Sequence, residues 1–132
     1  KVLDVGSGSG WSTALLAYLV GDTGQVFAVE RIAELKRFGE ENCARFACQN
    51  VTFHLAENTL GLAERAPFQR ILVSAAAQGD IPQILIDQLA PSGKLVIPID
   101  HTIMELKKNH AGDIEYCHQH EGYIFVPLLW RQ

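Results

Sequence analysis

The stretch Val2-Leu3-Asp4-Val5-Gly6-Ser7-Gly8-Ser9-Gly10 decides the fold that this sequence predicts. A short apolar strand that carries one acidic residue runs into three alternate glycines, and an apolar segment from Trp11 to Val20 follows. Glycines adopt the positive φ angles of a tight turn and let a ligand approach the backbone, while the first amides of a helix favour an anionic group. The stretch therefore predicts a strand, a ligand-binding turn and a helix.

The rest of the chain alternates between the patterns of strands and helices. We predict strands over residues 1–5, 25–30, 51–54, 69–74 and 94–99. We predict helices over residues 11–20, 32–46 and 80–89, with Asp80 as the N-cap of the third helix and a break at residues 90–93. The first helix is almost wholly apolar and should be buried against the sheet, whereas the second should be amphipathic.

The order of these elements predicts an α/β fold, with a doubly wound, mostly parallel, Rossmann-like sheet. Residues 102–107 and 114–126 alternate at period two around a turn, which predicts an antiparallel C-terminal hairpin with Gly122 as a bulge or break. In such a sheet a ligand binds beyond the carboxyl ends of the strands, at the point where the strand order reverses. We expect that point between the first and fourth strands.

Composition narrows the class of protein. The chain has 132 residues, 48% of them hydrophobic and 20% charged, and a formal net charge of −4, which predicts a single globular domain over residues 1–132. No long run of Lys or Arg points to nucleic acid, and no apolar stretch approaches the roughly 20 residues that span a bilayer. We therefore expect no nucleic-acid partner and no membrane association, and we expect a monomer.

The cysteines and histidines indicate neither disulfides nor a metal. Cys43, Cys48 and Cys117 are odd in number and form no CxxC pair, as expected of reduced thiols in the cytoplasm. His118 and His120 share a strand face without a third ligand, so we expect no metal site. Because Lys1 lies directly inside a strand, we expect that an N-terminal part of the parent protein is missing.

The glycine spacing distinguishes two cofactors. Dinucleotide-binding turns follow the pattern GxGxxG, whereas this turn has GxGxG after an acidic residue, which favours S-adenosylmethionine and leaves a dinucleotide as the alternative. Asp4 would then lie near the cofactor's ammonium or cap the turn, Glu30 would accept from the ribose hydroxyls, and Glu57 would accept from the adenine amino group. The complete predicted cofactor-binding set is Asp4, Gly6, Ser7, Gly8, Gly10, Glu30, Arg31, Glu57 and Asn58.

Several segments together resemble the protein-L-isoaspartate O-methyltransferase family: residues 2–13, 26–31, 66–77 (APFQRILVSAAA), 95–98 (LVIP) and 125–128 (FVPL). The resemblance implies a class I methyltransferase fold and S-adenosylmethionine as cofactor. It also implies transfer of the methyl group to the free α-carboxylate of L-isoaspartyl residues in damaged proteins, which are the expected partners.

The sequence also differs from the family's usual pattern at several positions. The family's acceptor-binding segment would precede Lys1, so the catalytic residues are unknown. The family usually has Gly-Asp-Gly where Ala56-Glu57-Asn58 stands, and the loop at residues 77–82 is one residue longer. An adenine or glutamine N-methyltransferase is disfavoured, because Ser74-Ala75-Ala76-Ala77 lacks the expected Pro-Pro-aromatic run. A methyltransferase with another acceptor, or a catalytically incomplete binding module, remains as an alternative.

Overall fold

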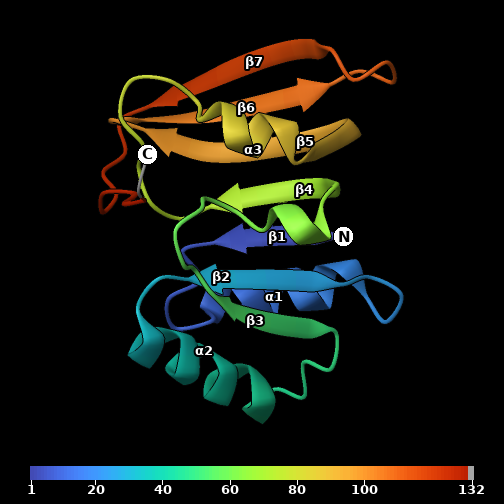
Figure 1. Ribbon diagram of the computed structural model, residues 1–132, viewed down its shortest axis with the longest axis vertical. Coiled ribbons are helices and arrows are strands. Elements are labelled where there is room, and N and C mark those ends of the chain that lie inside the picture. The colour runs from blue at the N-terminus through green and yellow to red at the C-terminus, as the bar shows by residue number, and fades with distance from the viewer. Residues whose placement is uncertain (131–132) are drawn as a thin grey trace.

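The computed structural model describes residues 1–130, which form a seven-stranded sheet flanked by helices (Figure 1). The strand order is β3-β2-β1-β4-β5-β6-β7. The strands are β1 (Val2–Val5), β2 (Val26–Glu30), β3 (Val51–Leu55), β4 (Phe68–Val73), β5 (Leu89–Ile99), β6 (Thr102–Lys108) and β7 (Ile114–Glu121). The helices are α1 (Trp11–Val20), α2 (Ala33–Arg45) and α3 (Gln83–Asp87), with a 3₁₀ turn, η1, at Ala63–Arg65.

The sheet is doubly wound, as the sequence predicts. Strand β1 pairs in parallel with both β2 and β4, so the strand order reverses between β1 and β4. Helix α1 lies behind the sheet in Figure 1 and α3 lies in front of it. Every residue of β1 and β2 is buried, as expected for parallel strands covered on both faces. The main core cluster includes Leu3, Phe68, Ile71, Leu85, Leu95 and Ile97.

The third helix and the fifth strand differ from the prediction. Helix α3 begins at Gln83 with Pro82 as its N-cap, so Asp80 does not cap it, and no side-chain cap bond is present there. Strand β5 begins at Leu89 rather than at Lys94, because Leu89 pairs with Phe68 of β4. The residues of the expected break form an irregularity within the strand, where Ser92 has a positive φ of 58°. Residues 90–93, expected to break the chain between a helix and a strand, therefore form a bulge within β5.

The apolar surfaces of the first two helices are less buried than predicted. In α1 only Thr13 and Ala17 are buried, and Trp11 and Tyr18 are 73% and 85% exposed. In α2 only Gly39 and Cys43 are buried, and Phe38 is about half exposed. Helix α2 contacts α1, β2 and β3, yet its large apolar side chains Leu35 and Phe38 are partly exposed to solvent. The prediction that the apolar first helix is buried is therefore wrong for the exposed side chains of α1.

The C-terminal hairpin is confirmed, and its second strand is shorter than expected. Strands β5, β6 and β7 pair antiparallel, and β7 ends at Glu121, next to Gly122 with its positive φ of 97°. Gly122 is the break. The following residues return to the sheet's centre, where Ala76 and Pro127 form a parallel bridge. No helix within residues 1–130 is long and apolar enough to cross a membrane.

Candidate functional site

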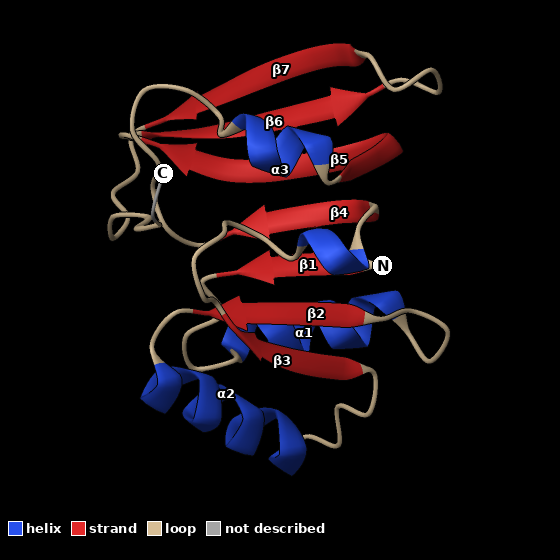
Figure 2. Cartoon of the chain, viewed as in Figure 1, coloured by secondary structure: helices blue, strands red, loops and turns tan. Residues whose placement is uncertain are grey.

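A cavity of about 700 Å³ opens at the carboxyl ends of the parallel strands. The arrowheads of β1, β2, β4 and β5 point to this edge of the sheet in Figure 2. The cavity is lined by residues at or after the ends of β1, β2, β3 and β4 and by a C-terminal segment: Val5, Gly6, Gly8, Val29, Glu30, Arg31, Ile32, Leu35, Ala56, Glu57, Asn58, Thr59, Leu60, Gly61, Ser74, Ala75 and the segment 126–130. The cavity therefore lies at the reversal of strand order, where a ligand was expected.

The Glu30 carboxylate connects the glycine turn to the start of the next loop. Its Oε2 atom accepts a hydrogen bond from the Gly8 amide at 3.0 Å. Its Oε1 atom accepts from the amides of Arg31 at 2.8 Å and Ile32 at 3.0 Å. A carboxylate offers about four acceptor positions, so these bonds leave about one free, on Oε2. The side chain is only 6% exposed and lines the cavity, so it can accept one further bond from a ligand hydroxyl.

The amides of the glycine turn already have partners within the protein. Gly6 and Ser7 donate to the Val29 carbonyl at 2.9 and 3.2 Å, and Gly10 donates to the Ser7 carbonyl at 2.9 Å. With the Gly8 amide bound to Glu30, these four amides are not free to hold a carboxylate. The turn's own tight geometry therefore uses these four donors, whereas the first amides of α1 remain the expected position for an anionic group.

The three glycines serve two different purposes. Gly6 and Gly8 line the cavity with φ angles of 78° and 51°, and a Cβ atom at either would find no neighbour closer than 4.0 Å. They leave room for a ligand. Gly10 instead packs against α2, since a Cβ atom there would lie 2.8 Å from the Gly39 carbonyl oxygen. Gly39, which the sequence did not single out, is the matching small residue on α2.

Asp4 and Ser7 lie behind the cavity wall. Asp4 is fully buried, and its Oδ2 atom accepts from the hydroxyls of Thr13 at 2.6 Å and Ser12 at 3.0 Å, at the start of α1. Its Oδ1 atom and the Ser7 hydroxyl are buried without a hydrogen-bond partner. Burial raises the pKa of Asp4, the two hydroxyls oppose this, and the charge of Glu30 adds to it. Asp4 thus links β1 to the hydroxyls of the first turn of α1 and retains one unsatisfied oxygen, while no side chain caps that helix.

The cavity wall brings together most of the predicted cofactor-binding residues. Gly6, Gly8, Glu30, Arg31, Glu57 and Asn58 line it. Within the described residues, Asp4, Ser7 and Gly10 do not contribute to that wall. The charged residues on it are Glu30, Arg31 and Glu57, with Asp4 buried behind the turn. This excess of carboxylates suits a ligand that carries positive charge and disfavours a pyrophosphate.

The segment 126–130 forms a side of the cavity that the sequence did not predict. The Ala76 amide donates to the Val126 carbonyl, and the Leu128 amide donates to the Ala76 carbonyl, both at 2.7 Å. Leu128 and Trp130 pack against the main core cluster. In the sequence, the FVPL motif at residues 125–128 is only a mark of the family. The alternating pattern assigned residues 114–126 to one strand, so it did not predict that the segment after Gly122 reaches the cavity.

Gln88, at the end of α3, also supports the wall without a sequence signal. Its side-chain amide accepts from the Leu62 amide at 2.7 Å and donates to the Leu60 carbonyl at 2.9 Å. Gln88 is 3% exposed, so both bonds are buried. It therefore fixes the loop whose residues Leu60 and Gly61 line the cavity.

Comparisons of the sequence with a family profile and with curated relatives all point to one family. A sequence profile of the family described as Protein-L-isoaspartate(D-aspartate) O-methyltransferase matches residues 1–132. A protein-L-isoaspartate O-methyltransferase of Methanothrix thermoacetophila is 43% identical over 132 residues, covering 98% of this chain and 61% of the relative. One of Pyrococcus abyssi is 37% identical over 141 residues, covering 100% of this chain and 63% of the relative. The chain spans about three fifths of the length of these curated relatives.

Solved structures share the fold. A protein-L-isoaspartate O-methyltransferase superposes with a TM-score of 0.82 at 24% identity, covering 96% of this chain and 41% of that one. A precorrin-6y C5,15-methyltransferase of Geobacter metallireducens has a TM-score of 0.62 at 24% identity, over 73% of this chain and 52% of that one. These likenesses show the α/β fold of the chain. Because the family profile matches along residues 1–132, the chain belongs to the protein-L-isoaspartate O-methyltransferase family.

Proposed function

We propose that this chain binds S-adenosylmethionine and carries the cofactor half of an enzyme that methylates the free α-carboxylate of L-isoaspartyl residues in damaged proteins. The observation that carries the proposal is the buried Glu30 carboxylate on the cavity wall, bound to the Gly8 amide of the glycine turn. Family membership supports the reaction and the acceptor.

The residues present fit this cofactor. Asp4 Oδ1 is buried without a partner, and Glu30 retains about one acceptor position, so two carboxylates near the turn suit a ligand with an ammonium and a sulfonium. A dinucleotide would instead bring a pyrophosphate to a turn whose four amides are already bonded. Because S-adenosylmethionine also carries a carboxylate, the bonded amides do not distinguish the two cofactors. The excess of carboxylates on the cavity wall is what supports S-adenosylmethionine over the dinucleotide alternative.

The proposal assigns a different part of the cofactor to each part of the cavity wall. Glu30 would hold a ribose hydroxyl, and Glu57 and Asn58 would offer polar atoms to the adenine, beside the apolar side chains of Ile32 and Leu35. Gly6 and Gly8 leave the space beside β1 open. When bound, S-adenosylmethionine supplies an electrophilic methyl group on a positively charged sulfur.

The acceptor side requires positioning more than acid–base chemistry. An isoaspartyl carboxylate is ionised at neutral pH, so the protein need only bring it into line with the methyl group and exclude water. Ser74 and Ala75 line the cavity at the end of β4, and their small size leaves room for two ligands to approach. The segment 126–130 borders the same side of the cavity.

A methylation assay tests the reaction. The protein is incubated with methyl-labelled S-adenosylmethionine and a peptide that contains one L-isoaspartyl residue, with the matching L-aspartyl peptide as control. We expect label, released by mild base as expected of a methyl ester, only with the isoaspartyl peptide. Label on both peptides, or on an amine, would overturn the proposed acceptor.

Calorimetric titration separates the cofactor from the reaction. We expect S-adenosylmethionine to bind and NAD not to bind at the same concentration. Binding without methyl transfer would favour the second candidate, a catalytically incomplete binding module. Binding of NAD alone would overturn the cofactor assignment.

The finer expectations follow from the same proposal. The three free cysteines support action in the reducing cytoplasm. We infer that the protein meets its protein substrates as a monomer, which a sedimentation measurement checks through the molar mass in solution.

A further inference from the structure

Two cysteines meet where α2 ends. The amide of Cys48 donates to the Cys43 carbonyl at 3.2 Å, and the amide of Ala47 donates to the Ala44 carbonyl at 3.2 Å. Ala47 has a positive φ of 54°. This bonding pattern is the Schellman motif, in which the side chain of the second residue past the cap contacts the third residue from the helix end. Here those two residues are Cys48 and Cys43.

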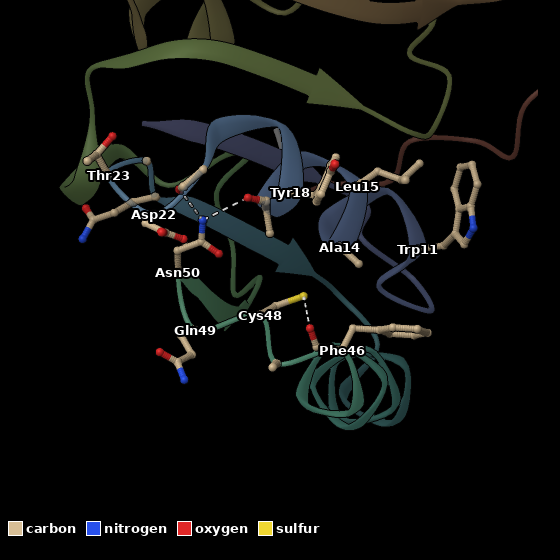
Figure 3. A pocket seen from close by; sticks show the side chains of 15 residues that line it. Trp11, Ala14, Leu15, Tyr18, Asp22, Thr23, Phe46, Cys48, Gln49 and Asn50 are labelled. Atoms are coloured by element: carbon tan, nitrogen blue, oxygen red, sulfur yellow. Dashed lines mark hydrogen bonds between the residues drawn. The ribbon is translucent and has the colours of Figure 1, made fainter.

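The two thiols differ in their access to solvent. Cys43 is 3% exposed, whereas Cys48 is half-buried and lines a groove between α1 and the end of α2, with Trp11, Tyr18 and Phe46 (Figure 3). Burial raises the pKa of Cys43 to about 11, and the neighbouring Cys48 thiol adds to the rise. Cys48 is therefore the thiol that a dissolved reagent reaches first.

The buried thiol contacts the glycine turn. Cys43 Sγ donates to the Gly10 carbonyl at 3.5 Å, and Gly10 is the N-cap of α1. The same carbonyl accepts the Ala14 amide at 2.9 Å, the first hydrogen bond of that helix. A change in the bonding of Cys43 therefore acts on the backbone of the turn that borders the cavity.

We propose that Cys43 and Cys48 are a redox modification site, which a hydroperoxide converts to a reversible disulfide. The Cys48 thiolate attacks the terminal peroxide oxygen and the O–O bond breaks, so Cys48 becomes a sulfenic acid. The leaving alkoxide, or hydroxide when the oxidant is hydrogen peroxide, takes up the proton that the Cys48 thiol released. The Cys43 sulfur then attacks the Cys48 sulfur, an S–S bond forms, and the sulfenic oxygen leaves as water with the Cys43 proton. Overall, two thiols and one hydroperoxide give one disulfide, one water and one alcohol, or a second water when the oxidant is hydrogen peroxide.

The local backbone suits this product. The hydrogen bond between the Cys48 amide and the Cys43 carbonyl holds the main chains of the two cysteines next to each other, as a disulfide requires. The positive φ of Ala47 keeps the chain folded back toward α2. Forming the disulfide removes the S–H donor from the Gly10 carbonyl, which loosens the start of α1.

Peptide mapping tests the disulfide. Trypsin cleaves after Arg37, Arg45 and Arg65, so Cys43 lies in the peptide 38–45 and Cys48 in the peptide 46–65. After treatment with hydrogen peroxide and blocking of free thiols, we expect these peptides as one linked species that a reductant separates. The variant Cys117→Ser should keep the link, and Cys48→Ser should lose it. Separate peptides with oxygen added to Cys48, or a link to Cys117, would overturn the proposal.

Hydrogen exchange tests the contact with the turn without any cofactor, so its result does not depend on the proposed function. We expect the Ala14 amide to exchange roughly threefold faster in the oxidised protein than in the reduced one, because a weak S–H bond to the same carbonyl is lost. Cys48→Ser, treated in the same way, should show no change. Equal exchange in the oxidised and reduced wild type would overturn the link between the cysteine pair and the turn.

Discussion

The Gly8 amide donates a 3.0 Å hydrogen bond to Oε2 of Glu30, although 22 positions separate the two residues. This bond joins the turn after β1 to the end of β2 at the cavity wall. Glu30 thus fixes the backbone of the turn and retains about one acceptor position, on Oε2, for a ligand. Its two tasks give the first prediction.

Replacing Glu30 with Ala should weaken binding of S-adenosylmethionine by about 2 kcal/mol, or roughly thirtyfold, because one bond to a charged acceptor is lost. Calorimetric titration measures the change in Kd. Glu121→Ala removes an exposed carboxylate from β7, outside the cavity wall, and should leave Kd unchanged. An unchanged Kd in both variants would exclude Glu30 from the binding site.

Replacing Gly10 with Ala should lower the free energy of unfolding by about 3 kcal/mol, because a Cβ atom meets the Gly39 backbone and the residue has a positive φ. Urea denaturation at neutral pH measures the loss. Gly112→Ala is the matched control, since its φ is 95° and a Cβ atom there finds open space. That control should cost about 1 kcal/mol, from backbone conformation alone. Equal losses would show that the α1–α2 contact is not tight.

The stability of the protein relative to an Asp4→Asn variant should fall as pH rises from the acid range to neutral. The folded-state pKa of Asp4 is raised, chiefly by burial, so the folded protein holds that proton more tightly than the unfolded chain. The stabilisation from the protonated form is complete below the unfolded pKa and is lost as pH rises through the folded pKa. Urea denaturation of both proteins across this range measures the difference. A difference that is constant with pH would contradict the shift.

Replacing Gln88 with Ala should lower the free energy of unfolding by about 3 kcal/mol, since the Leu62 amide and the Leu60 carbonyl lose their buried partner. The Leu60–Gly61 side of the cavity should also loosen, which hydrogen exchange at Leu62 detects. Gln83→Ala removes an exposed side chain that bonds only to Asp87, and should change stability by less than about 0.5 kcal/mol. Protection of the Leu62 amide in Gln88→Ala would contradict this role.

The first strand, turn, helix and second strand could be predicted from sequence because each has a strong local signal. Helix α1 begins at Trp11, directly after Gly10, and ends before Gly21, while β2 ends at Glu30 as expected. The cavity followed from strand order alone, because carboxyl ends of parallel strands share one edge. These parts needed no knowledge of distant contacts.

The remaining parts depend on contacts between segments far apart in sequence. Pairing of Leu89 with Phe68 turned an apparent break into the start of β5. The amides of the glycine turn donate to Val29 and Glu30, which lie on the neighbouring strand β2. The glycine pattern alone therefore could not predict that these amides have partners within the protein. Likewise, only the bridge between Ala76 and Pro127 reveals that segment 126–130 belongs to the cavity.

That bridge also sets an order of events during synthesis. The cavity wall combines Val5 and Gly6 with Leu128 and Trp130, which the ribosome adds much later. Domains fold as the chain emerges, so the sheet's parallel strands can assemble before the wall is complete. The nascent protein consequently cannot have its finished ligand site until translation has passed residue 130, and a ribosome stalled earlier would hold a folded sheet with an open cavity.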